Sequence, residues 1–324
     1  MSGDSSPRWQ SFYMENSVSS RRWGVVALLV CSSIWGFAFS AQSLGMNYMG
    51  PCGFNALRSV IGGLALIPGI ALLDCLNKRK PSFWGDVRDK VSRRALCLGG
   101  ILSGLTLGVA SLLQQVGLLY STAGKAGFLT ALYIILVPII GAFLKHRTSP
   151  LVWFAALVAL YGMSLLCNVS WNGGLQAGDW WLIGCAAGFA LQILVVAKYV
   201  CLTDCVRLSC LQFFVAALVS AIAFPFTSET ISWSAVCQGW GPLLFCGVMS
   251  SGVAYTLQNV GEKYVHPVVA TLVMSLESVF SAIGGWLILH EELSRREVLG
   301  CALIFAAVIL AQVPLPKKRL EKVE

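Results

Sequence analysis

Residues 113–120 read LQQVGLLY and residues 257–264 read LQNVGEKY, so the pattern LQxVGxxY occurs twice at a distance of 144 residues. The same distance aligns FLTALY at residues 128–133 with LVMSLE at residues 272–277. A weaker match at a distance of 154 residues places Trp35 opposite Phe189, and Arg58 opposite Gln212. Similarity at a fixed distance indicates a duplicated unit, and recognising it comes before any proposal about a site.

The chain around these repeats is too apolar for a soluble protein. Of its 324 residues, 56% are hydrophobic and 12% are charged, a composition that requires contact with lipid. A hydrocarbon core needs about 20 apolar residues per helix, and continuous apolar blocks favour helices over the alternating strands of a barrel. Division of the blocks at turn-forming residues predicts ten membrane-spanning helices, at residues 24–42, 54–74, 95–118, 126–144, 151–168, 180–198, 208–226, 239–260, 268–289 and 298–315.

The distribution of basic residues predicts the orientation. A net charge of +8 would suggest nucleic acid as the partner of a soluble protein. Here, however, ten spans leave only Lys125, Arg295 and Arg296 on one side, with almost all other Lys and Arg residues on the opposite side. The positive-inside rule therefore predicts that both termini are cytoplasmic, with the lipid bilayer and not nucleic acid as partner.

The repeat and the spans together predict the domain organisation. Each copy has five spans, and an odd number forces the second copy to enter the membrane from the opposite side. The fold class is therefore an all-α membrane protein of ten transmembrane helices in two inverted five-helix repeats, an architecture typical of secondary transporters. The predicted segments are a disordered cytoplasmic tail (1–21), the first repeat (22–170), the second repeat (178–315) and a basic cytoplasmic tail (316–324).

Two charged residues, Glu277 and Arg58, fall inside predicted spans and away from their ends. Glu277 lies about ten residues into the ninth span, where a carboxylate costs roughly 2.5 to 3.5 kcal/mol unless it meets a partner or water. It can pair with a cationic substrate, carry a proton or fix helix packing. Arg58, in the second span, can bind a carboxylate or phosphate, or extend to lipid headgroups.

Amides and aromatic residues complete the candidate substrate pathway. Gln115 and Gln258 place amides in the third and eighth spans, where they bridge helices or contact substrate. Trp35, Tyr133 and Tyr255 can line a cavity with rings that suit cations, or anchor the chain at the membrane surface. Tyr133 is the strongest candidate of the three, because the repeat places it opposite Glu277.

The motifs that would indicate an enzyme are absent from the sequence. It has no GxxxxGK[ST] loop for ATP phosphates, no HExxH or HxxEH for zinc, and no GxSxG nucleophile turn. The 12 cysteines form no CxxC pair and only 3 histidines occur, so neither a metal nor a cofactor is expected.

The order of several motifs resembles the ten-helix EamA branch of the drug/metabolite transporter superfamily over nearly the whole chain. Ser278 stands where that family usually has proline, and residues 145–147, KHR, replace a more usual GER. The similar motifs are Arg58 together with IWGFAF (34–39), STAGKAGFLTALY (121–133), ALQIL (190–194), LQF (211–213), SLE (275–277), GGW (284–286) and EELS (291–294).

The resemblance implies a secondary, non-ATP transporter that moves a small polar or amphipathic metabolite, such as an amino acid, by alternating access. Efflux is the expected direction and a bacterial inner membrane the expected location. Protons are the candidate coupling ion, with Glu277 as the protonatable group. Two alternatives stay open: uptake or exchange of a nucleotide-like metabolite such as S-adenosylmethionine, and a receptor or scaffold that transports nothing. A monomer and a homodimer are equally compatible with the sequence.

Overall fold

The structure is a computed structural model that describes residues 18–46, 48–78, 82–83, 89–121, 123–144, 148–168, 175–289 and 293–312. Every regular element in these ranges is a helix. The predicted tail at 316–324 and most of the tail at 1–21 lie outside the described residues. Within the described residues, the first helix begins at Val18.

Within the described residues, the first half of the chain has six helical elements and the second half eleven. In the first half these are α2 (Val18–Met46), α3 (Pro51–Leu76), α4 (Lys90–Tyr120), α5 (Ala123–Thr130), α6 (Tyr133–Phe143) and α7 (Pro150–Leu166). The second half comprises α8 (Ala177–Tyr199), η1 (Val200–Leu202), α9 (Cys205–Ala223), η2 (Phe224–Phe226), α10 (Trp233–Gln238), α11 (Trp240–Leu244), the π-helical segment η3 (Phe245–Ala254), α12 (Tyr255–Tyr264), α13 (Pro267–Met274), α14 (Leu276–Leu289) and α15 (Arg295–Gln312).

Seven helical stretches of the described chain are long and apolar enough to cross a membrane, which makes the chain a multi-pass membrane protein. They are 51–76, 90–120, 125–143, 177–199, 205–226, 240–264 and 267–284. The helix α7 is apolar but shorter, and α2 and α15 are not among the seven.

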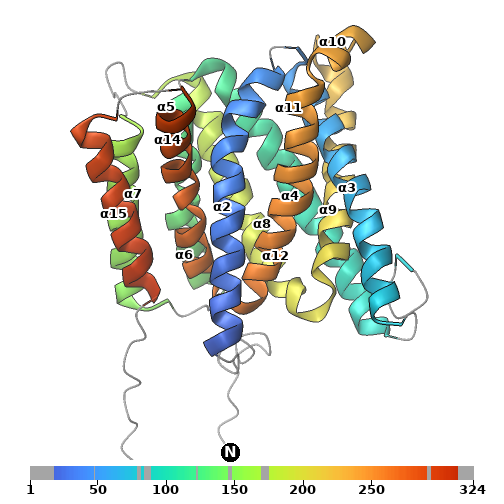
Figure 1. The fold of residues 1–324 in the computed structure, drawn as a ribbon, viewed down its shortest axis with the longest axis horizontal. Coiled ribbons are helices and arrows are strands. Elements are labelled where there is room, and N and C mark those ends of the chain that lie inside the picture. The colour runs from blue at the N-terminus through green and yellow to red at the C-terminus, as the bar shows by residue number, and fades with distance from the viewer. Residues whose placement is uncertain are drawn as a thin grey trace, which may run out of the picture.

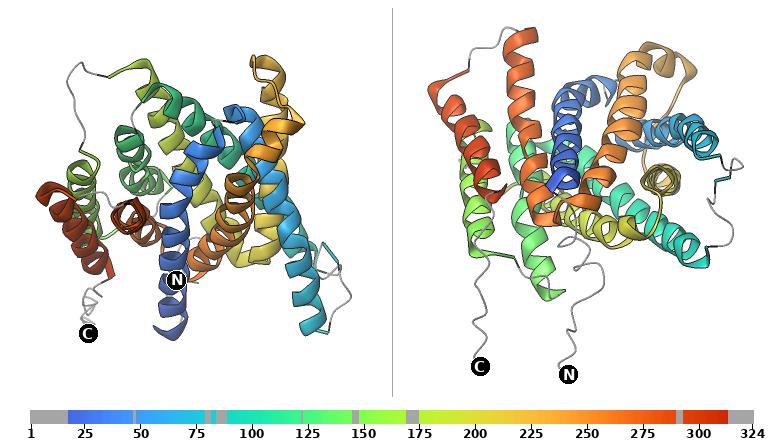
Figure 2. Two further views of the ribbon diagram at one scale, coloured as in Figure 1. Left: turned by 45° about the horizontal axis from the view of Figure 1, so that its top comes forward. Right: turned by 60° about the horizontal axis from the view of Figure 1, so that its bottom comes forward.

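The two halves interleave instead of forming separate bundles. The helix α4 packs along α8, α3 along α9, α2 along α12, and α7 along α15, so each of these pairs joins one half to the other. Figure 1 shows α7 and α15 at one edge of the molecule and α3 towards the opposite edge, and both views of Figure 2 keep α7 and α15 side by side. The first turn of α2 and the last turn of α15 lie at the same end of the bundle (Figure 1).

Two predicted spans are broken near their middle. Residues 131–132 interrupt the fourth span between α5 and α6, and Ser275 interrupts the ninth between α13 and α14. Both were predicted as continuous helices, because neither site has a proline or glycine that would announce a break. The breaks occur at equivalent positions, since Ala131 and Ser275 are 144 residues apart.

Candidate functional site

A cavity of about 60 Å³ lies beside the two helix breaks. Its walls come from both halves of the chain. The lining residues are Trp35 and Gln42 (α2), Arg58 (α3), Gln114 (α4), Thr130 (α5), Tyr133 (α6), Phe189, Gln192 and Ile193 (α8), Ser250 (η3), Tyr255 and Gln258 (α12), Met274 (α13) and Glu277 (α14).

The cavity brings together six of the seven residues that the sequence analysis selected, namely Trp35, Arg58, Tyr133, Tyr255, Gln258 and Glu277. The seventh, Gln115, lies behind the wall, where its Nε2 donates to Oε1 of Gln42 at 2.8 Å. Its neighbour Gln114 lines the cavity instead.

Residues that are equivalent in the two repeats face the same cavity. The equivalence comes from the sequence distances of 144 and 154 residues, and the lining comes independently from the structure. The pairs are Tyr133 with Glu277, Gln114 with Gln258, Thr130 with Met274, and Trp35 with Phe189. The cavity therefore lies where matching parts of the two halves meet.

Glu277 is held at the cavity by its own helix and by the other half. Its side chain is almost fully buried, and it occupies the first turn of α14, where the helix dipole favours a negative charge. Tyr133, its equivalent in the first half, lines the same cavity and lies close enough to the Glu277 carboxylate to interact with it electrostatically. The two equivalent residues of the repeats thus lie near each other at the interface between the halves.

Arg58 is fixed inside the protein and does not extend to headgroups. Only 7% of the residue is exposed. Its Nε donates to Oδ1 of Asn55 at 2.9 Å, and its Nη1 donates to Oε1 of Gln42 at 2.6 Å. Asn55 in turn donates to Ser220 Oγ on α9 at 2.8 Å. These bonds hold a cation at the cavity wall with a defined orientation.

Aromatic rings form another part of the wall. The rings of Trp35 and Tyr255 meet edge to face with centroids 4.7 Å apart, and Phe213 packs on Tyr255 in the same way at 5.2 Å. The Trp35 Nε1 donates to the carbonyl oxygen of Ser250 in the π-helical segment at 3.3 Å. Long π-helices are rare and are found frequently at functional sites.

Sequence reasoning missed a buried carboxylate next to the cavity. The eighth span was predicted to end at residue 260, which left Glu262 in a loop, but α12 continues to Tyr264 and Glu262 is fully buried. Its Oε1 accepts a hydrogen bond from Gln258 Nε2 at 2.6 Å. The available signal was the spacing of four residues within LQNVGEKY, which places both side chains on one helical face.

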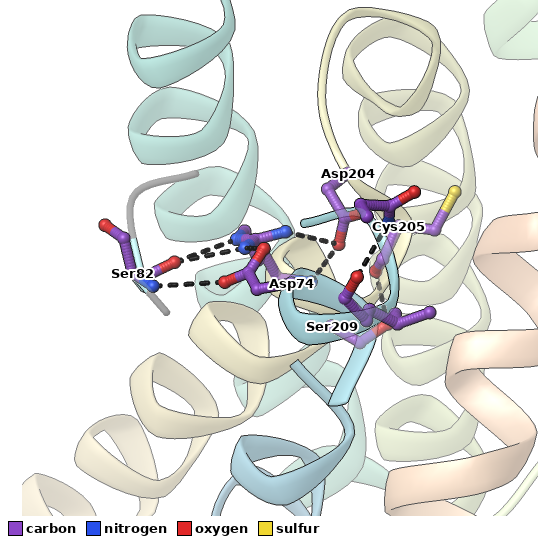
Figure 3. Close-up of polar contacts among 8 residues, drawn as sticks. Asp74, Ser82, Asp204, Cys205 and Ser209 are labelled. Atoms are coloured by element: carbon purple, nitrogen blue, oxygen red, sulfur yellow. Dashed lines mark hydrogen bonds and ion pairs between the residues drawn. The ribbon is translucent and has the colours of Figure 1, made fainter. Parts of the chain in front are cut away.

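Ion pairs between the halves were also missed. At one end of the bundle, Arg207 Nη2 of α9 lies 2.5 Å from Asp74 Oδ1 of α3. Figure 3 shows this cluster, in which Arg207 also donates to the Ser82 carbonyl oxygen and the Ser82 amide donates to Asp74. Lys125 of α5 pairs with the buried Asp179 of α8 at 2.5 Å. In the described part of the chain, no group of three His, Cys, Asp or Glu residues could hold a metal ion.

Known proteins share this chain's sequence pattern and its fold. An uncharacterized transporter of Archaeoglobus fulgidus is 28% identical over 90% of this chain and 87% of its own length. The uncharacterized transporter YwfM of Bacillus subtilis is 25% identical over 91% of this chain and 95% of its own length. A solved structure, described only as the crystal structure of a protein, has a TM-score of 0.71 at 19% identity, covering 92% of this chain and 97% of its own, so the two share a fold.

The family itself is shown by two matches within the chain. The sequence model of the EamA-like transporter family matches residues 22–168 and again residues 176–312. This confirms the family that the motifs predicted, and it indicates a transporter instead of an enzyme. The chain belongs to the EamA-like transporter family, within the drug/metabolite transporter superfamily.

Proposed function

We propose that this protein is a secondary transporter that moves a small zwitterionic metabolite with an amino group, such as an amino acid, by alternating access. The observation that carries the proposal is the cavity lined by four pairs of repeat-equivalent residues. A site shared by two similar, oppositely oriented halves can face either side of the membrane when the halves exchange conformations.

The proposed topology has ten spans, because we add α2, α7 and α15 to the seven helices that qualify by length and composition. Ten crossings agree with the position of the first turn of α2 and the last turn of α15 at the same end of the bundle. The two halves are then inverted repeats, and the equivalent helix breaks support this relation. We place both termini in the cytoplasm of a bacterial cell and the spans in its inner membrane.

The cavity is smaller in this conformation than a usual ligand pocket. About 60 Å³ holds a few water molecules, whereas ligand pockets usually measure about 300 to 1,000 Å³. Entry of substrate therefore requires helices to separate. The breaks at residues 131–132 and Ser275 lie next to the site, and interrupted helices are typical binding and moving elements of secondary transporters.

The charges at the wall favour a zwitterion. The Arg58 guanidinium suits a substrate carboxylate. Glu277 and the rings of Trp35 and Tyr255 suit an ammonium group. We propose that Glu277 exchanges this ammonium group for a proton, which makes protons the coupling ion and permits efflux against a solute gradient.

Reconstitution into liposomes tests the function. The assay offers a panel of radiolabelled amino acids and amines, with and without an imposed pH gradient. Glu277→Gln removes the charge and should lower saturable flux at least about tenfold and abolish its response to pH, because the ammonium group loses its ion pair. Glu297→Gln, a matched change outside the cavity, should leave flux unchanged.

Two results would count against the proposal. One is the absence of saturable flux for every compound of the panel. The other is wild-type cellular function of a Glu277→Gln, Arg58→Ala double variant expressed at the normal level, which would favour a receptor or scaffold. In expressing cells, depletion of the substrate indicates efflux and accumulation indicates uptake.

A further inference from the structure

Glu262 lies outside the cavity lining, yet it contacts a residue that lines the cavity. It is fully buried one helical turn beyond Gln258 on α12, and its Oε1 accepts from Gln258 Nε2 at 2.6 Å. A carboxylate offers only acceptors, whereas an amide has one donor end and one acceptor end. In the structure, the end of the Gln258 side chain that faces Glu262 is accordingly the NH₂ group.

A second amide binds the same NH₂ group. Gln258 Nε2 also donates to Gln192 Oε1 at 3.3 Å, and Gln192 Nε2 donates onward to Gln212 Oε1 at 3.5 Å. Both donor positions of Gln258 are thus used by acceptors of the protein. Gln258 Oε1, which is buried, has no hydrogen-bond partner among the described residues.

We infer that Glu262 is a positioning residue, which turns the Gln258 amide so that its carbonyl oxygen serves as a hydrogen-bond acceptor for the substrate. This inference rests on the proposed function, because it assigns a selectivity role within the same cavity. Gln258 and Glu277 both line that cavity. Glu277 supplies the charge that attracts a cationic group, and Gln258 Oε1 requires that this group carry an N–H or O–H donor.

The selectivity follows from the cost of a buried acceptor that finds no donor. A primary, secondary or tertiary ammonium group has at least one N–H and satisfies Gln258 Oε1, whereas a quaternary ammonium group has none. Both kinds of cation are attracted by Glu277 and by the aromatic wall. Discrimination between them therefore depends on the orientation of Gln258, and through it on Glu262.

The neighbouring residue offers a matched control. Asn259 is also a buried amide of α12, but its Nδ2 donates to Ser209 Oγ at 2.7 Å, and neither residue lines the cavity. Ser209→Ala, on α9, removes the buried hydrogen bond that Asn259 of α12 donates. It leaves the hydrogen bonds of Gln258 unchanged. Any effect that merely reflects weaker packing of α12 should appear in this variant too.

The test compares two probes of nearly equal size in proteoliposomes. Radiolabelled N,N-dimethylglycine carries one N–H donor, and N,N,N-trimethylglycine carries none. The wild type should transport the dimethyl compound about tenfold faster, the factor expected for one unsatisfied buried acceptor. Glu262→Met, which removes the acceptor for Gln258, should bring the ratio close to one. Glu262→Gln, which retains a weaker acceptor, should give an intermediate ratio, and Ser209→Ala should keep the wild-type ratio.

A wild-type ratio in either folded Glu262 variant overturns the inference, and so does an equal loss of discrimination in Ser209→Ala. Side-chain amide NMR signals of ¹⁵N-glutamine-labelled protein provide a readout that needs no transport. The Gln258 signals should shift in both Glu262 variants, and unchanged signals overturn the positioning role. If the wild type transports neither probe, the proposed zwitterion transport fails, while a shift of the Gln258 signals still supports orientation by Glu262.

Discussion

Glu277 and Tyr133 are equivalent residues of two repeats that diverged into an acid and a hydroxyl donor. In the structure both side chains line the same cavity. A carboxylate inside a membrane protein is costly unless it has a partner. In the proposed mechanism the Tyr133 hydroxyl is that partner, supplied from the opposite half, and the pair links substrate binding to the relative position of the halves.

Tyr133→Phe tests this link, because it removes the hydroxyl and keeps the ring. A hydrogen bond to a charged group contributes about 1.5 to 3 kcal/mol, so we expect flux of the best substrate to fall about tenfold. The free energy of unfolding should decrease by about 1 to 2 kcal/mol. Both are measured on purified protein, in liposomes and by denaturant titration in detergent. Tyr161→Phe, on the exposed surface of α7, is the control, and wild-type flux in Tyr133→Phe would contradict the link.

The site could be predicted only in part, and the reason is physical. Glu277 and Arg58 stand out because an isolated charge in an apolar span has few explanations. Glu262 was missed because it follows the predicted end of the eighth span at residue 260, and its spacing of four residues from Gln258 indicates a shared helical face only if the helix continues. Gln42 is the last residue of a predicted span, and nothing in its neighbours shows that it accepts hydrogen bonds from Arg58 and Gln115.

At the scale of the elements, the sequence predicted the starts and ends of helices better than it predicted the breaks within them. Apolar blocks and caps such as Ser149, whose Oγ accepts from the Val152 amide, determine where helices begin. The breaks at residues 131–132 and Ser275 depend instead on tertiary contacts, because alanine, leucine and serine are all tolerated within helices. The structure shows that the two breaks occur at equivalent positions. This recurrence identifies the breaks as a property of the repeat.

The helices α2 and α14 pack closely, and this contact leads to a prediction about Gly36 of α2. A Cβ atom on Gly36 would lie 2.7 Å from the Glu277 carbonyl oxygen and 2.8 Å from the Ser281 amide nitrogen, and backbone atoms cannot rotate away. Gly36→Ala should therefore separate the helices, lower the free energy of unfolding by about 1 to 3 kcal/mol and reduce flux.

The control for Gly36→Ala is Gly69→Ala in α3, where a Cβ would meet no atom within 4 Å. This variant should be neutral or more stable by about 0.5 to 1 kcal/mol, because alanine favours the helix. Equal behaviour of the two variants in thermal unfolding and in flux would refute the role assigned to the contact between α2 and α14.

At the scale of the molecule, the two halves interleave, so an ion pair between them contributes to the stability of the whole fold. Asp74 and Arg207 are both buried, and removal of Asp74 leaves Arg207 with only the longer ion pair to the partly exposed Asp204, at 3.6 Å. Asp74→Leu should therefore lower the free energy of unfolding by about 3 to 5 kcal/mol. Addition of Arg207→Met should recover at least half of the loss, as measured by denaturant titration of the two single variants and the double variant. Simple additivity of the two losses would show that the pair is not coupled.

The orientation of the whole molecule can be tested with two of its own cysteines. Cys75 is exposed at the end of α3, near the end of the bundle where α2 begins, and Cys237 is exposed on α10 at the opposite end. With a cytoplasmic N-terminus, a membrane-impermeant maleimide should label Cys237 in intact bacterial cells and Cys75 only after permeabilisation. The single variants Cys237→Ser and Cys75→Ser assign each signal. The reverse pattern would invert the proposed sidedness. Labelling of both from one side would contradict a membrane-crossing α3, and with it the inverted arrangement on which alternating access through the shared cavity depends.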